Sequence, residues 1–124
     1  MEAAVVLDWM WRPICYHAPQ GRTAGSLPDS FDLWTVLHEH RGHLLGVAHS
    51  HPGSGAPSPS YTDVTTFASL EAGLGLRLMW PIITTDSVRV FHWKGPDRLD
   101  YGLWEGPVTD ADLAWVPELR RLSQ

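Results

Sequence analysis

The sequence contains a single cysteine, Cys15, among its 124 residues. One thiol cannot form an internal disulfide framework or a zinc module built from several cysteines. Basic residues are also few, because nine Lys and Arg stand against fourteen Asp and Glu, and 9 − 14 gives a formal net charge of −5. Nucleic-acid-binding domains and membrane-surface patches are usually basic, so we expect neither partner. The scarcity of cysteine favours a reducing, cytoplasmic location.

The sequence has no long apolar run and no internal repeat. Its first apolar stretch, residues 3–10, is too short to span a bilayer and is interrupted by Asp8. It also lacks the basic start of a secretory signal. Hydrophobic residues make up 44% of the chain and charged residues 19%, which is typical of a folded domain. A chain of this length has room for one ordinary core, so we expect a single domain over residues 1–124.

What the sequence does contain is an alternation of strand-like and helix-like segments. Short runs rich in Val, Ile, Leu, Tyr and Trp predict strands over 3–11, 13–18, 43–50, 76–84, 88–93 and 99–104. Stretches rich in Pro, Gly and Ser predict surface loops over 19–30 and 52–60. Seven tryptophans are expected mainly in the core, although Trp9 and Trp11 would share one strand face and could form a patch for a partner.

Three segments have helical character. The first helix would be capped by Asp29 or Ser30 and would end near residue 40. The second covers 63–72 and would be stopped by Gly73. The third covers 110–122, with Thr109 as its cap and Pro117 disturbing its first part. This mixed order predicts an α/β fold in which a mixed central β-sheet is flanked by helices.

The most informative stretch is His49-Ser50-His51-Pro52, followed by Ser60 and Asp63. Side chains alternate along a strand, so the two imidazoles project to one side and Ser50 to the other. The loop that begins at Pro52 then leads to Asp63 at the start of a helix, where a carboxylate is favoured. Two nitrogens and one carboxylate oxygen leave a fourth tetrahedral position for water. That ligand set is typical of a catalytic zinc site.

These residues resemble the signature of the JAMM (MPN+) metalloproteases, H-S/T-H-P-x7-S-x2-D, at every fixed position. Gly46 also fits the usual Gly-x-x-His approach of that family. The resemblance is sharp over residues 46–63 and looser over 3–104. It implies a JAMM/MPN (JAB) domain of the cytidine-deaminase-like α-β-α type, similar to compact bacterial members.

The resemblance implies a role for each residue of the motif. His49, His51 and Asp63 would hold Zn²⁺, and Ser60 would donate a hydrogen bond to the oxyanion of the tetrahedral intermediate. A glutamate upstream of the motif would activate the water and later protonate the leaving amine. The matching position at the start of the first strand is Glu2. The other preceding glutamate, Glu39, would lie in a helix.

Two features of the family are altered in this sequence. Family members usually carry a helix before the glutamate and glycines after it, whereas here Met1 directly precedes Glu2 and those glycines are missing. We expect the last helix, or a dimer partner, to cover the sheet face left bare. The oligomeric state is not set by the sequence.

The resemblance also implies the substrate, an amide or isopeptide bond at the C-terminal tail of a ubiquitin-like protein. Such a tail could pair with a sheet edge near the motif. Compact bacterial relatives are associated with ubiquitin-like conjugation, including antiviral defence, and with sulfur-carrier metabolism. One alternative is therefore a peptidase acting on a sulfur-carrier protein or a small peptide. The other is a non-catalytic MPN-type scaffold.

A second group of polar residues invites a zincin interpretation. A zincin needs H-E-x-x-H, but after His38 and Glu39 the next matching position, 42, is glycine, and His43 comes one residue late. We therefore expect His38, His40 and His43 to form a surface cluster, with a weak secondary metal contact as the alternative. The remaining histidines, His17 and His92, and Cys15 are expected to be ordinary packing or half-buried residues.

Overall fold

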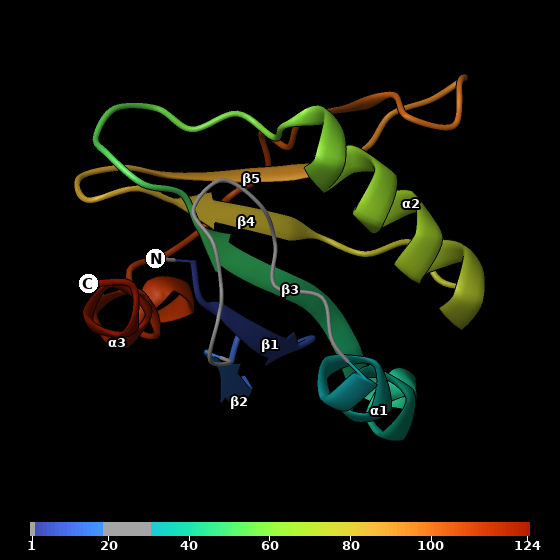
Figure 1. The fold of residues 1–124 in the computed structure, drawn as a ribbon, viewed down its shortest axis with the longest axis horizontal. Helices are drawn as coiled ribbons and strands as arrows, with labels where there is room; N and C mark the ends of the chain where they lie inside the picture. The colour runs from blue at the N-terminus through green and yellow to red at the C-terminus, as the bar shows by residue number, and fades with distance from the viewer. Residues whose placement is uncertain (1, 19–30) are drawn as a thin grey trace.

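The computed structural model describes residues 2–18 and 31–124 (Figure 1). The predicted loop over 19–30, with the helix cap at Asp29 or Ser30, lies outside the described residues. In the described part, no helix is long and apolar enough to cross a bilayer.

A six-stranded mixed sheet forms the centre of the fold. Its strands are β1 (Ala4–Asp8), β2 (Pro13–His17), β3 (Leu44–Ser50), β4 (Trp80–Ile83), β5 (Val88–Trp93) and β6 (Tyr101–Leu103). Their order across the sheet is β2-β1-β3-β4-β5-β6. Only β3 and β4 run parallel, and the other four neighbouring pairs are antiparallel. The edge strands are therefore β2 and β6, and β3 lies in the interior of the sheet.

Helices cover both faces of this sheet, which confirms the predicted α/β class. They are α1 (Phe31–Glu39), α2 (Tyr61–Leu74) and α3 (Val116–Leu122), with short 3-10 helices at Arg41–His43 and Ala111–Leu113. Figure 1 shows the strands between α3 on one side and α1 and α2 on the other. The alternation of side chains along β1 supplies both layers, because Ala4 and Val6 pack in the α1–α2 layer while Val5 and Leu7 pack in the α3 layer.

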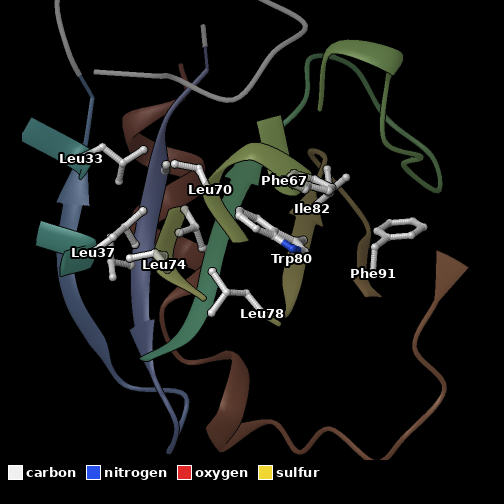
Figure 2. Close-up of a cluster of buried hydrophobic side chains, with 12 residues drawn as sticks. Leu33, Leu37, Phe67, Leu70, Leu74, Leu78, Trp80, Ile82 and Phe91 are labelled. Carbon is white, nitrogen blue, oxygen red and sulfur yellow. The ribbon is translucent and has the colours of Figure 1, made fainter. Parts of the chain in front are cut away.

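The larger core lies between the sheet and helices α1 and α2. Phe67 of α2 stacks on Trp80 of β4 with ring centroids 4.2 Å apart. Figure 2 shows Leu70 and Leu74 of α2 between this pair and the leucines of α1, Leu33 and Leu37. The buried cluster consists of Ala4, Val6, Leu33, Leu37, Val47, Phe67, Leu70, Leu74, Leu78, Trp80, Ile82 and Phe91. This core holds α2, whose first turn carries Asp63, firmly against β3 and β4.

The opposite face of the sheet is covered by α3. Trp115, Val116 and Leu119 are buried against Val5 and Ala48 in a second cluster. The last helix therefore supplies the cover that the sequence analysis expected from it. The helix nonetheless begins later than predicted, at Val116, because a separate 3-10 turn precedes Trp115. Pro117 lies in the first turn of α3, where an N–H would have no partner within the helix.

Two sequence predictions about element ends are wrong. Gly73 does not stop α2, which continues to Leu74 and ends at Gly75 in a left-handed conformation with φ of 69°. Gly73 instead lies against the Trp34 ring, where a Cβ would come within 2.3 Å of that ring. The strand predicted over 76–84 is also shorter, because β4 begins only at Trp80.

The prediction that Trp9 and Trp11 share a strand face is also wrong. The strand β1 ends at Asp8, whose carboxylate accepts hydrogen bonds from the backbone of Met10 and Arg12 and so closes a tight turn. Trp11 adopts a left-handed conformation in this turn. As a result Trp9 is 64% exposed, whereas Trp11 packs beside Trp104.

A buried glutamate in α2, which the sequence analysis did not single out, ties three elements together. The Glu71 carboxylate is 3% exposed and accepts from Leu78 N at 2.8 Å and from Trp80 Nε1 at 3.1 Å. It also pairs with Arg77 at 3.0 Å and accepts from the Tyr101 hydroxyl. A buried carboxylate is tolerated here because hydrogen bonds satisfy it from several directions.

Replacing this carboxylate is therefore expected to destabilise the fold. Glu71→Ala leaves two buried donors without an acceptor, and we expect the free energy of unfolding to fall by about 3 kcal/mol. Chemical denaturation of the variant measures this loss. The matched control is Glu118→Ala, which removes an exposed carboxylate paired with Arg121 and should change stability little. Equal effects of the two variants would contradict this account of Glu71.

Candidate metal centre

The register between β1 and β3 explains how distant parts of the chain meet. Ala4 pairs with His49 in this antiparallel ladder. Two residues back along β1 and two along β3, the same register brings Glu2 opposite His51. Because side chains alternate, Glu2, His49 and His51 all project to the α1–α2 face of the sheet, while Ser50 projects toward α3. The sequence prediction for the two histidines is confirmed in this respect.

His49, His51 and Asp63 converge on one point. The Nε2 atoms of the two histidines are 3.1 Å apart. Asp63 Oδ2 lies 2.8 Å from His51 Nε2, and Asp63 Oδ1 lies 3.3 Å from His49 Nε2. The His49 and Asp63 side chains are fully buried, while that of His51 is 14% exposed, so the cluster reaches solvent through His51.

This donor set fits a small divalent cation. Metal–ligand bonds of about 2.0–2.1 Å at tetrahedral angles separate neighbouring ligand atoms by roughly 3.3 Å. The three observed separations, 2.8 to 3.3 Å, are close to that edge length. Imidazole nitrogens combined with a carboxylate oxygen are also the donors that zinc accepts. The group can therefore hold a metal with little rearrangement.

Asp63 is oriented by the start of α2. Ser60 is the N-cap of this helix: its Oγ accepts from Asp63 N at 3.0 Å, and Asp63 Oδ2 accepts from Ser60 N at 3.0 Å. This reciprocal arrangement is a capping box. It explains the spacing of two residues between the serine and the aspartate, because the box requires its partners three positions apart. From the sequence, Ser60 is expected only in catalysis, although its S-x-x-D pattern is also typical of a helix cap.

The loop that carries Ser60 is fastened to the turn between β4 and β5. Thr84 Oγ1 donates to the Gly55 carbonyl at 2.7 Å, and Gly55 N donates to Asp86 Oδ1 at 2.7 Å. Thr85 N donates to the Gly53 carbonyl at 3.0 Å. The predicted loop over 52–60 is confirmed, and these bonds hold it near the histidines.

Glycine at position 46 is needed for the local path of β3. Gly46 forms a parallel bridge with Met79, and a Cβ at this position would lie 1.7 Å from the Met79 carbonyl oxygen. A side chain would therefore push β3 away from the segment entering β4. The close approach keeps His49 in register with Ile82 of β4.

Glu2 lies beside the histidine pair. Its carboxylate and the two histidine nitrogens all lie within 4.8 Å of one another, and Glu2 is only 1% exposed. The other candidate, Glu39, joins no such group among the described residues. It is exposed at the end of α1. Of the two glutamates considered from the sequence, the structure therefore brings Glu2 to the site.

The local environment divides the charges within the cluster. Burial lowers the pKa of His49 and outweighs the opposing effect of Asp63, so this ring stays neutral. The hydrogen bond between His51 and Asp63 raises the pKa of His51. Burial opposes ionisation of Asp63, but hydrogen bonds from both histidines hold its pKa well below the usual range. The site thus combines an ionised carboxylate, Asp63, with a neutral imidazole, His49.

His49 is held by packing more than by a second hydrogen bond. Its Nδ1 is buried and has no hydrogen-bond partner within residues 2–18 and 31–124. The ring lies edge-on to Phe67, with centroids 6.0 Å apart, and to His51 at 4.9 Å. A metal-binding histidine usually has its other nitrogen bonded to a carbonyl or carboxylate, so the core aromatic ring takes over that orienting role here.

A cavity of about 350 Å³ adjoins the cluster on the side of His51. Its walls come from the ends of β3 and β4, from the start of the 52–60 loop and from the end of the chain. The lining residues are Ser50, His51, Pro52, Gly53, Ile83, Thr84, Thr85, Arg120, Ser123 and Gln124. Of the candidate site residues only His51 lines this cavity, and Ser50, Ile83 and Ser123 place much of its wall on the α3 side of the sheet.

The other histidines lie outside this centre. His40 Nδ1 and His43 Nε2 are 3.0 Å apart at the surface, and His38 lies edge-on to Trp34. Among the described residues they join no group of three ligands, so the surface-cluster interpretation is confirmed. His17 and His92 lie half-buried in β2 and β5, as expected.

Comparison with protein families matches residues 4–94 to the family described as prokaryotic homologs of the JAB domain. The chain belongs to this family. The match includes the two histidines, Ser60 and Asp63, and so agrees with the resemblance in the motif. Glu2 and the whole of α3 lie outside the matched residues of this JAB domain. Among curated proteins, no match is found.

Proposed function

We propose that this JAB-domain protein is a zinc-dependent hydrolase that cleaves an amide or isopeptide bond at the C-terminal tail of a ubiquitin-like protein. The observation that carries the proposal is the convergence of His49, His51 and Asp63, with the Glu2 carboxylate within 4.8 Å of the histidine nitrogens. A scaffold has no need for buried ligands and a buried carboxylate at one point, because burying them without a metal is costly.

Zinc is the proposed cofactor because three protein ligands leave one tetrahedral position open. When bound, the metal would lower the pKa of a coordinated water and polarise the carbonyl group of the scissile bond. His49, His51 and Asp63 would be its ligands. Asp63 would keep its second task in the capping box, which fixes the angle at which its carboxylate meets the metal.

Glu2 is proposed to move the proton during hydrolysis. Its carboxylate lies within 4.8 Å of the histidine nitrogens, close enough to accept a hydrogen bond from a water between them, while Asp63 serves as the third ligand. It would take a proton as the water attacks the carbonyl carbon and would give that proton to the amine as the C–N bond breaks. The same carboxylate thus acts first as a base and then as an acid.

Ser60 is proposed to donate a hydrogen bond to the developing oxyanion. Its oxygen already accepts from Asp63 N, but that bond uses only a lone pair and leaves the hydroxyl proton available. The cap therefore positions the hydroxyl at the first turn of α2 without consuming its donor.

The strand order limits where a substrate tail could pair with the sheet. The sequence analysis expected a tail to pair with a sheet edge near the motif, but β3 has neighbours on both sides, β1 and β4. No strand edge is therefore free beside His49. The cavity next to His51 is the place where residues on one side of the scissile bond would lie.

A panel of ubiquitin-like proteins fused through their C-terminal tails to a reporter tests the proposal. We expect zinc close to one equivalent per chain and cleavage of at least one fusion, with cleavage lost on chelation and restored by added zinc. Cleavage of short peptides or sulfur-carrier fusions alone would favour the alternative peptidase. Absence of cleavage of any fusion by the zinc-loaded protein would contradict a hydrolase and favour the scaffold.

A further inference from the structure

Two serine hydroxyls fasten the start of the chain to the C-terminal helix. Ala3 N donates to Ser50 Oγ at 3.0 Å, and the Oγ atoms of Ser50 and Ser123 are 2.6 Å apart. Ser123 Oγ also donates to the Leu119 carbonyl at 2.7 Å. Ser50 is 3% exposed, so its hydroxyl is shielded from bulk water. The contacts form a continuous chain from the segment before β1 to the last turn of α3.

The Ser123 hydroxyl lies within hydrogen-bond distance of both Ser50 Oγ and the Leu119 carbonyl, and its single proton serves one of them at a time. Ser50 Oγ accepts from Ala3 N and lies 3.4 Å from the Ala3 carbonyl, which also accepts from Ser50 N at 3.1 Å. In either arrangement of the protons the two hydroxyls stay bonded to each other, and neighbouring bonds strengthen one another.

The end of this series of hydrogen bonds that lies in α3 is firmly held. Leu119 is fully buried in the α3 core, together with Trp115. Arg120 Nε donates to the Thr84 carbonyl at 2.9 Å, which joins α3 directly to the end of β4. Ser123 is thus held by the helix that covers the sheet, and it can serve as a fixed point for Ser50 and Ala3.

We propose that Ser50 and Ser123 are positioning residues that hold the Glu2 carboxylate at the metal centre. Ala3 faces α3, so its neighbour Glu2 faces the histidines on the other side of the sheet. Fixing the Ala3 backbone on the α3 face of the sheet therefore limits where the Glu2 side chain can lie on the α1–α2 face. The two serines contact no reacting atom. The inference rests on the proposed function, because a general base must be placed accurately.

The inference extends the site beyond the part of the chain that matches the JAB family. Both Glu2 and Ser123 lie outside residues 4–94. The base would thus be supplied from one end of this chain and its support from the other end, with Ser50 of the motif between them.

Serine variants of the full chain loaded with zinc test the inference. We expect Ser50→Ala to lower kcat roughly 10–100-fold and Ser123→Ala roughly 3–10-fold, with KM within about twofold and zinc near one equivalent. Ser50→Thr keeps the hydroxyl and should restore most of kcat. The matched control is Ser69→Ala, an exposed serine in α2, which should behave as the wild type.

Amide exchange at Ala3, measured by NMR, provides a readout independent of turnover. We expect exchange roughly tenfold faster or more in Ser50→Ala and unchanged in Ser69→Ala. The inference is overturned if kcat stays at the wild-type value in both alanine variants, or if kcat falls only because zinc is lost. If the wild type cleaves nothing, the proposed function fails by itself. In that case the exchange measurement still tests the link between Ser50 and the Ala3 backbone, which is contradicted if Ala3 exchanges equally fast in Ser50→Ala and wild type.

Discussion

Replacing His51 with alanine is expected to abolish both metal binding and hydrolysis. His51 Nε2 lies within 3.1 Å of His49 Nε2 and within 2.8 Å of Asp63 Oδ2, so it is one corner of the ligand triangle. Two remaining ligands hold zinc poorly, and we expect affinity to fall by roughly 100-fold or more. Metal analysis of the purified variant gives zinc per chain, and the fusion panel gives its rate.

A surface histidine provides the matched control for this prediction. His43→Ala removes an exposed imidazole that also contacts another histidine, His40, but lies outside the ligand group. It should keep one equivalent of zinc and the wild-type rate. Thermal unfolding of His51→Ala shows whether its fold is intact. A folded His51→Ala protein that retains stoichiometric zinc would contradict the assignment of the metal centre.

The architecture of the sheet was predictable because its strands carry a strong local signal. The strand predicted over 88–93 has the same bounds as β5, and the one over 43–50 begins only one residue before β3. The first is rich in β-branched and aromatic residues, the second is a short apolar run, and both have clear turn signals at their ends. The α/β class followed from the order of such segments, even where their ends were misplaced.

The errors occur where contacts between distant residues decide the structure. Gly73 looks like a helix stop in the sequence, but the Trp34 ring of another helix makes a small residue necessary there. Glu71 looks like a solvent-facing helix residue, and only the fold shows that Trp80 and Tyr101 surround it. Local propensity does not contain these tertiary constraints.

The candidate site was predictable in its residues but not in its support. Strand alternation alone placed His49 and His51 on one face, and the resemblance supplied Glu2 and Asp63. The register of β1 with β3, which brings Glu2 opposite His51, depends on sheet pairing that a single sequence does not reveal. The contact between the two serines that hold this segment could not be predicted from the sequence either, because Ser123 is 73 positions away from Ser50.

Substituting Glu2 with glutamine is expected to lower kcat by about 10² to 10⁴-fold while leaving zinc bound. Glutamine has nearly the same shape as glutamate but cannot take a proton from water. The His49, His51 and Asp63 ligands are unchanged, so the metal content should remain near one equivalent. The combination of retained zinc with lost turnover separates a base from a ligand, since removing a ligand loses both.

Glu39→Gln is the matched control, because Glu39 is the other glutamate that precedes the motif. It lies at the end of α1, next to the start of β3, whereas the histidines lie at the opposite end of that strand (Figure 1). Seven strand residues span about 20 Å, too far for a carboxylate to reach the attacking water. Glu39→Gln should therefore turn over at the wild-type rate. If Glu2→Gln keeps full turnover while Glu39→Gln loses it, the base has been assigned to the wrong end of the strand, and the register argument for Glu2 fails with it.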